Sequence, residues 1–404
     1  MRVIGIIAEF NPFHKGHEYL ISRAKEIVGD PRAIVMVVMS GPFVQRGTPS
    51  ILPKGIRTKQ ALKCGADIVL ELPFTFACAP SERFAEGAVE TLYRTGVVTD
   101  LVFGTDCTDP EILKTLADVT PDDETIRKCL SEGMSYPAAR AEGIIKALGP
   151  TEYDESSVRE ALRMPNSILG LDYLRALKKT GADGRFKIHM IPRIPDFSAT
   201  SSREIYLKHK TTAELADAMP ALIPDPALAV MLAGLSNGTF SHPDIGRFAE
   251  DLINDVSRLD LSSYAYMSDG LDGYIGNTVS SLRVQTYDAL KAALQTKHFT
   301  TARIMRALAS MSVGQTAVYV TENKHPLYIR VLGFNRDGRY CLKIMGKCAR
   351  LPILHNCSDA KELYSSSPEL RAQFELDLRA CEVQGRYLNI PGASQWNEAP
   401  VQTK

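Results

Sequence analysis

The sequence has no net charge. Its 404 residues contain 47 Lys and Arg against 47 Asp and Glu. A protein without net charge has no overall field that draws it onto nucleic acid or an anionic membrane. Any contact with RNA must therefore come from a local basic patch.

Paired cysteines are also absent. The chain has eight scattered cysteines and no CxxC motif. In a chain of this length, the pattern indicates reduced thiols in a cytoplasm and argues against a disulfide framework or a zinc knuckle. We therefore expect no protein-bound metal ion.

Long apolar runs are missing as well. The run at residues 3–8 is too short for a signal peptide, lacks a basic region before it and continues directly into Glu9. No other run reaches the length that spans a membrane. We expect a cytoplasmic protein with no membrane contact, and nothing in the sequence indicates an obligate protein partner.

Two common nucleotide-binding motifs do not occur. Without a Walker A loop or GxGxxG, the chain is neither a P-loop ATPase nor a dinucleotide-binding Rossmann protein. Instead, His14, Gly16 and His17 lie between the apolar run and the start of an amphipathic helix. Helix N-termini attract anions, and two imidazoles add hydrogen bonds and, if protonated, charge. A surface loop with two idle histidines is the alternative, but this position favours a phosphate site.

Strand and helix signals alternate through the first two hundred residues. Apolar runs predict strands at residues 3–8 and 33–39, and we expect further strands at 68–72, 101–103 and 187–191. Helical spacing and caps predict helices from residue 17 to about 28 and at 54–64, 81–94 (capped by Ser81) and 166–179, with another opening at 198–203. This alternation predicts a parallel sheet with ligands beyond the carboxyl ends of its strands.

The second half of the chain has a mainly helical pattern from about residue 210 to 315. Residues 328–334 and 339–345 then resemble two strands joined by a hairpin turn at 335–338. We expect a catalytic domain at 1–210 and a mainly helical region at 211–404 that ends in a small α+β element.

The strand, HxGH loop and helix together resemble the HIGH-motif nucleotidylyltransferases, relatives of the class I aminoacyl-tRNA synthetase core. Asn11 stands where that superfamily usually has Thr or Ser. Residues 198–203 resemble its second phosphate-binding stretch, (S/T)xTxxR, with Ser202 in place of the usual Ile; KMSKS is absent. The resemblance implies a Rossmann-like α/β nucleotidylyltransferase domain in which His14, His17 and Arg203 act on the ATP phosphates.

Several ordered blocks narrow the resemblance. Residues 11–17, 41–47, 66–73, 103–106 and 165–170 look like the tRNA(Met) cytidine acetate ligase family, and weaker similarity continues through 270–271, 296–303 and 328–334. The resemblance implies a ligase that activates acetate with ATP to acetyl-adenylate. It would then transfer the acetyl group to N4 of the wobble cytidine of elongator tRNA(Met), forming N4-acetylcytidine. Mg²⁺ is the expected charge partner of ATP.

The same resemblance implies which residues line the ATP site. Three lie outside the motif: Gly104 suits a close backbone approach, Asn166 offers amide hydrogen bonds, and Arg193 follows a predicted strand. A turn glycine, a helix-cap asparagine and a surface arginine are the plain alternatives. The motif itself contributes Ile7, Ala8, Glu9, Phe10, Asn11, Pro12, Phe13, His14, Lys15, Gly16, His17, Glu18, Tyr19 and Leu20.

RNA contacts have a weaker signal. Four basic residues near Phe299 form a candidate patch for tRNA phosphates, with a solvated helix face as the alternative; they are Lys291, Lys297, Arg303 and Arg306. Gln45 and Arg46 lie in a loop beside the predicted site. They could contact phosphate or the cytidine, and a solvated loop is an equal alternative. Two other functions stay open: a small-molecule adenylyltransferase of cofactor biosynthesis, and a non-enzymatic RNA-binding protein.

Overall fold

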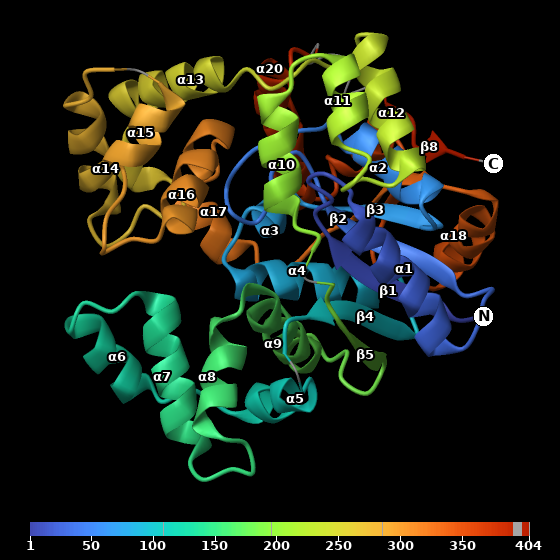
Figure 1. Ribbon diagram of the computed structural model, residues 1–404, viewed down its shortest axis with the longest axis horizontal. Helices are drawn as coiled ribbons and strands as arrows, with labels where there is room; N and C mark the ends of the chain where they lie inside the picture. The colour runs from blue at the N-terminus through green and yellow to red at the C-terminus, as the bar shows by residue number, and fades with distance from the viewer. Residues whose placement is uncertain (108, 195, 285, 391–397, 404) are drawn as a thin grey trace.

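A central sheet organises the fold. The structure is a computed structural model that describes residues 1–107, 109–194, 196–284, 286–390 and 398–403 (Figure 1). The strand order is β5-β4-β1-β2-β3-β6-β7, and β8 pairs with β6. The strands within these residues are β1 (Val3–Ala8), β2 (Ile34–Ser40), β3 (Ile68–Leu72), β4 (Asp100–Thr105), β5 (Lys187–Pro192), β6 (Ile329–Phe334), β7 (Ile353–Leu354) and β8 (Val401–Gln402).

The first five strands run parallel, as the alternation predicted. Val3 of β1 lies opposite Ile34 of β2, and Asp100 of β4 lies opposite Lys187 of β5. β6 comes from the far end of the chain and pairs antiparallel with β3. The carboxyl ends of β1 to β5 therefore meet at one edge of the sheet, where the predicted ligand loops lie.

Helices connect and cover these strands. The first ten are α1 (Lys15–Val28), α2 (Lys54–Lys63), α3 (Phe74–Ala77), α4 (Ser81–Arg94), α5 (Glu111–Asp118), α6 (Asp123–Ser131), α7 (Tyr136–Leu148), α8 (Glu155–Arg163), α9 (Pro165–Lys179) and α10 (Ala199–Lys208). The other helices within the described residues are α11 (Thr212–Ala218), α12 (Asp225–Ser236), α13 (Ile245–Arg258), the 3₁₀ helix η1 (Leu261–Ser263), α14 (Leu271–Ser280), α15 (Tyr287–Ala293), α16 (Thr301–Val313), α17 (Ala317–Glu322), α18 (Arg336–Cys348), α19 (Cys357–Leu363) and α20 (Pro368–Tyr387).

Both faces of the sheet are buried. Alternate residues of a strand point to opposite faces, so Met36 and Val38 join one core with α4, α9 and α18. Val35 and Val37 join the other core with α1, α2 and α12. A third core joins α13 to α16 with α20. Figure 1 shows α6 to α8 and α13 to α16 as two separate groups on the same side of the sheet.

The predicted hairpin at residues 328–345 is wrong. Its first half is β6, but residues 336–348 form α18. The Asn335 side chain accepts the Gly338 N–H at 2.9 Å and caps that helix. Cys341, Leu342 and Met345 bury one helical face against the sheet, so the apparent turn is a helix start.

Two smaller expectations need comment. Ser81 does not cap α4: Pro80 is the N-cap residue, no side chain caps it, and Ser81 is the first helical residue. The domain boundary at residue 210 stays a prediction, although β6 from beyond it pairs with β3. None of the described helices has the length and apolar character needed to cross a bilayer.

Candidate active site

A cavity of about 1010 Å³ lies at the carboxyl edge of the parallel strands. Residues that follow β1, β2, β4 and β5 line it, and so do side chains from α7 on one side and α16 on the other. The volume is at the upper end for small-molecule sites. It leaves room for a nucleotide and part of a second substrate.

The HxGH motif forms the N-terminus of α1. His14 is the N-cap residue, and its Nδ1 accepts the Gly16 N–H at 3.1 Å. His17, three residues later, forms the reciprocal hydrogen bond: its Nδ1 accepts the His14 N–H at 3.2 Å. The two histidines thus form a capping box, a role that Ser or Thr with Glu or Gln usually fills. The prediction of a helix N-terminus at this motif is confirmed.

The capping box fixes the protonation of both rings. A ring nitrogen that accepts an N–H carries no proton, so each neutral imidazole holds its proton on Nε2. Burial, with Arg193 and Arg203 nearby, lowers the pKa of His14 to about 4. Burial, with His14 and Arg193, lowers the pKa of His17 well below its ordinary value. The histidines therefore present two neutral N–H donors to the cavity, not the charge that protonation would add.

Packing holds these donors in place. The two imidazoles stack with ring centroids 3.7 Å apart. Phe10 and Phe13 contact His17 at centroid distances of 4.9 and 5.5 Å. Gly16 leaves no room for a side chain, because a Cβ there would lie 2.9 Å from the His14 ring.

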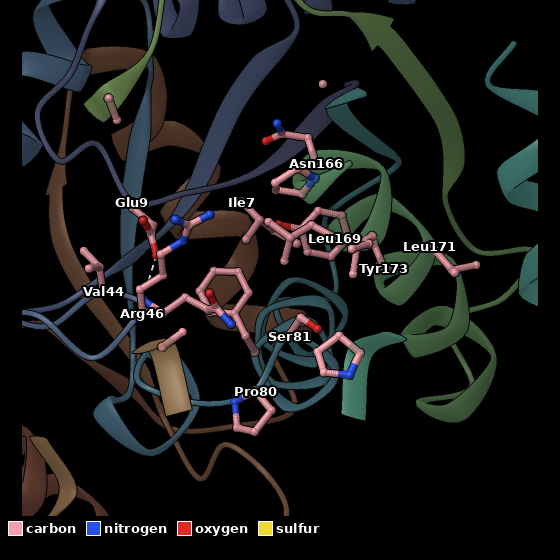
Figure 2. A pocket seen from close by; sticks show the side chains of 18 of the residues that line it. Ile7, Glu9, Val44, Arg46, Pro80, Ser81, Asn166, Leu169, Leu171 and Tyr173 are labelled. Carbon is pink, nitrogen blue, oxygen red and sulfur yellow. Dashed lines mark hydrogen bonds between the residues drawn. The ribbon is translucent and has the colours of Figure 1, made fainter. Parts of the chain in front are cut away.

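The residues before the histidines are tied to neighbouring loops. Asn11 Oδ1 accepts the Ile51 N–H at 2.9 Å, so the residue that replaces the usual Thr or Ser is a structural anchor. Glu9 Oε1 accepts the Gln45 N–H at 2.7 Å. Figure 2 shows Glu9 beside Arg46 in the cavity, which places the 41–50 loop at the site.

On the other side, the expected ATP residues form one cluster around an acid that was not assigned from the sequence. Asp106 accepts the backbone N–H and the side-chain amide of Asn166 at 3.1 and 2.7 Å. It also accepts a hydrogen bond from Arg193 at 3.1 Å. Gly104 lies beneath Arg193, since a Cβ on it would be 3.1 Å from Arg193 Cγ. The sequence did carry one signal for Asp106, since an acidic residue that directly follows a strand lies at the edge of the sheet where ligands bind.

Arg203 joins the two phosphate-binding stretches. It lies on α10, whose N-cap Ser198 accepts the Ser201 N–H. Its guanidinium donates to the carbonyl of Asn11 at 2.9 Å and to Thr200 Oγ1 at 3.1 Å. The structure therefore brings Arg203 to the HxGH loop, 186 positions away in sequence from His17.

The four basic residues expected to bind tRNA do not form a single patch. Arg303 and Arg306 line the cavity, where Arg306 is buried and Arg303 pairs with Asp269. Lys297 is exposed just before α16. Lys291 is exposed on α15 and borders a separate small cleft. The helical pattern of the sequence did not reveal that Arg306 points inward.

Comparison with known proteins places this site in a class. A family model for the HIGH nucleotidyl transferases matches residues 1–395. The chain resembles two proteins named tRNA(Met) cytidine acetate ligase. The protein of Acetivibrio thermocellus is 31% identical, covering 95% of this chain and 94% of the relative. The protein of Fervidobacterium nodosum is 33% identical, covering 89% and 84%.

Solved structures agree with this placement. The crystal structure of Thermotoga maritima TmcAL bound with alpha-thio ATP matches with a TM-score of 0.89 at 28% identity, covering 100% of this chain and 99% of that one. Its apo form matches with a TM-score of 0.88. Fold and site thus define a nucleotidyl transferase of the HIGH class. Within that class, the chain belongs to the tRNA(Met) cytidine acetate ligase family.

Proposed function

We propose that the chain is a ligase that activates acetate with ATP and transfers the acetyl group to N4 of the wobble cytidine of elongator tRNA(Met). The pair of Nε2–H donors at the N-terminus of α1 carries this proposal. Donors fixed before the reaction stabilise charge that develops as pyrophosphate leaves. Membership of the family supplies the choice of substrates.

In the first half-reaction, an acetate oxygen attacks the α-phosphorus of ATP, and the bond to the pyrophosphate oxygen breaks. Acetate is already ionised at neutral pH, so this step needs positioning and charge stabilisation more than a base. His14 and His17 would donate to the phosphates through Nε2–H, and the positive end of the α1 dipole would add to their effect. Arg203 would hold the β- and γ-phosphates, as a planar guanidinium can with two oxygens.

We propose that the cluster around Asp106 holds the nucleoside end of ATP. Asn166 and Arg193 are fixed by Asp106 and lie on the β4 and β5 side of the cavity. Gly104 permits the backbone of β4 to approach the ligand closely. The remaining expected contacts, from Ile7 to Leu20, lie at the end of β1, in the loop after it and at the start of α1.

Mg²⁺ fits this site as a companion of the ATP phosphates. Among the described residues, no three His, Cys, Asp or Glu side chains form a group that could hold a metal ion. Magnesium usually keeps waters and substrate phosphates as ligands, so it needs no protein cage. When bound, it would neutralise phosphate charge.

We propose that tRNA approaches from the side of α16. Arg303 and Arg306 would meet the acceptor nucleotide in the cavity, and the exposed Lys297 and Lys291 would bind phosphates outside it. Lys297→Ala should weaken tRNA binding. It should also reduce the slope of the logarithm of the binding constant against the logarithm of the salt concentration by about one, as expected for the loss of one phosphate contact. Acetate-dependent adenylate formation should not change. An unchanged tRNA affinity and salt slope would exclude Lys297 from the tRNA surface.

The eight cysteines suit the expected compartment. None forms a disulfide, and seven are buried. Cysteines outside disulfides are typical of a reducing compartment, so we propose the cytoplasm.

One experiment tests the reaction. The protein is incubated with ATP, radiolabelled acetate and bulk tRNA, and the digested tRNA is analysed for N4-acetylcytidine. Label that appears without tRNA would favour a small-molecule adenylyltransferase. Absence of ATP consumption with any acid would favour an RNA-binding protein without activity.

A further inference from the structure

Acetyl transfer needs a proton acceptor that the two histidines do not provide. The N4 amino group of cytosine must lose a proton when it becomes an amide. Both His14 and His17 already use Nδ1 to accept a backbone N–H, and their Nε2 atoms hold protons. The base for the second half-reaction must therefore be another group in the cavity.

Three carboxylates line the cavity within the described part of the chain. Glu82 pairs with Arg140 at 2.8 Å, and Asp269 pairs with Arg303 at 2.7 Å. A carboxylate paired with arginine is a weak base, because the cation stabilises its ionised form. Glu9 has no such direct pair in the described structure.

Glu9 is held by one oxygen only. Oε1 accepts the Gln45 N–H at 2.7 Å, and no described residue donates a hydrogen bond to Oε2. Burial raises the pKa of Glu9, against the opposing effects of the Gln45 N–H and of nearby arginines. The charged groups around it are Arg203, Arg46 and Arg57, and the other titratable neighbours are Tyr173 and Cys78, both buried.

Glu9 lies between two sides of the cavity. It follows β1, which is flanked by β4 and β2. Gly104 in β4 and Arg193 after β5 lie on one side, whereas Gln45 and Pro80 follow β2 and β3 on the other. Figure 2 shows Glu9 with Val44 and Arg46, across Ile7 from Asn166.

This half of the cavity also has donors without partners. Arg306 is 9% exposed, and its Nε has no partner among the described residues; the same holds for the Tyr266 hydroxyl. Both side chains line the cavity. Cytosine offers O2 and N3 as acceptors and N4–H as a donor, and a carboxylate is the usual acceptor for that N4–H. A carboxylate with one oxygen free of protein donors, as Glu9 has, is suited to accept that N4–H.

We propose that Glu9 is the catalytic base of acetyl transfer and accepts the N4 proton of a cytosine bound between the 41–50 loop and α16. This inference rests on the proposed function. The N4–C bond forms as N4 attacks the acetyl carbonyl carbon. The bond from that carbon to the phosphate oxygen breaks, and its electron pair leaves with AMP. The N4 proton passes to Glu9 Oε2 and then to water.

Glu9→Gln tests the step, because the amide oxygen can still accept the Gln45 N–H but the side chain cannot take a proton. Adenylate formation is measured by trapping with hydroxylamine, which needs no protein base. Transfer is measured as single-turnover acetylation of tRNA(Met). We expect the rate of acetyl transfer to fall by about 10²- to 10⁴-fold more than the rate of hydroxamate formation.

The control variant is Glu82→Gln, the same substitution at a cavity carboxylate that pairs with Arg140. It should transfer at a rate near that of wild type. Equal loss of both half-reactions in Glu9→Gln, or transfer at the wild-type rate, would overturn the role of Glu9. If Glu9→Gln does not fold, the wild-type transfer rate between pH 4 and 8 decides: it must fall towards low pH, and a flat profile overturns the proposal. No hydroxamate from the wild type would instead refute the proposed function.

Discussion

Replacing His17 separates its structural role from its chemical role. Its Nδ1 caps the backbone of His14, and its Nε2–H faces the cavity. His17→Ala removes both. Loss of a capping hydrogen bond costs about 1 kcal/mol, and a domain has roughly 5–15 kcal/mol of stability. The variant should therefore stay folded with its Tm lowered by a few degrees.

The catalytic loss should be larger. Removing one fixed donor to developing charge typically slows a reaction by about 10²- to 10³-fold, or about 3–4 kcal/mol. Acetate-dependent exchange of labelled pyrophosphate into ATP measures this step without tRNA. We expect a loss of that size in His17→Ala, beside a small change in the thermal melt.

Two further variants sharpen the test. Both Gln and Glu at this position can accept the His14 N–H, as in an ordinary capping box, so both should restore stability. Only Gln brings an N–H donor, so only His17→Gln should recover part of the exchange activity. If activity instead follows stability, with His17→Glu as active as His17→Gln, then His17 is only a cap and the phosphate contact is wrong.

Three other predictions concern the same site. Gly16→Ala would place a Cβ 2.9 Å from the His14 ring, so pyrophosphate exchange should fall at least tenfold. The control is Gly29→Ala at the open end of α1, which should lower stability by about 1 kcal/mol and leave the exchange activity intact. Similar losses in both would mean that Gly16 acts only through the helix. Folding lowers the pKa of His14 from 6.5 to about 4, so the unfolded chain binds the proton first as pH falls. Between pH 7 and 5 the wild type should therefore lose about 2 kcal/mol more of its free energy of unfolding than His14→Gln, as measured by equilibrium urea unfolding. Equal losses in the two proteins would refute a neutral buried His14. Asp106→Ala frees the side chains that it fixes, so the KM for ATP should rise about tenfold with a smaller change in kcat, and an unchanged KM would remove the cluster from the ATP site.

Local signals in the sequence predicted the part of the fold that carries the motif. The runs at residues 3–8 and 33–39 are apolar throughout because both faces of those strands are covered. The HxGH loop was placed correctly because a helix start depends on a few adjacent residues. These signals sufficed for the parallel sheet and for the position of the phosphate site.

Long-range pairing could not be predicted in the same way. β6 joins β3 across about 260 residues, and nothing in either segment specifies the other. Asn335 to Gly338 fit a turn as well as a helix start, and only burial of Met345 against the sheet decides between them. Asp106 was missed because its importance comes from Asn166 and Arg193, which reach it from other elements.

Buried charges link the second half of the chain to the catalytic loops. Arg57 is fully buried and donates to the carbonyls of Glu9 and Ser40. Glu9 directly follows β1, and Ser40 is the last residue of β2. Behind Arg57, Glu71 pairs with Lys54 at 2.9 Å and with Arg330 of β6 at 3.1 Å. Although burial raises the pKa of Glu71, these two cations hold it below its ordinary value.

Removing one partner from a buried ion pair costs about 3–5 kcal/mol, because the remaining charge has no water to replace it. A chain cut at residue 210 would leave Glu71 without Arg330. It would also remove α20, where Gln384 donates to the Ser50 carbonyl at 2.9 Å and thereby fixes the loop between β2 and α2. The second half therefore helps to build the cavity, in addition to the role in tRNA binding that we propose for it. This dependence distinguishes the chain from a minimal adenylyltransferase, whose catalytic domain would need no such support.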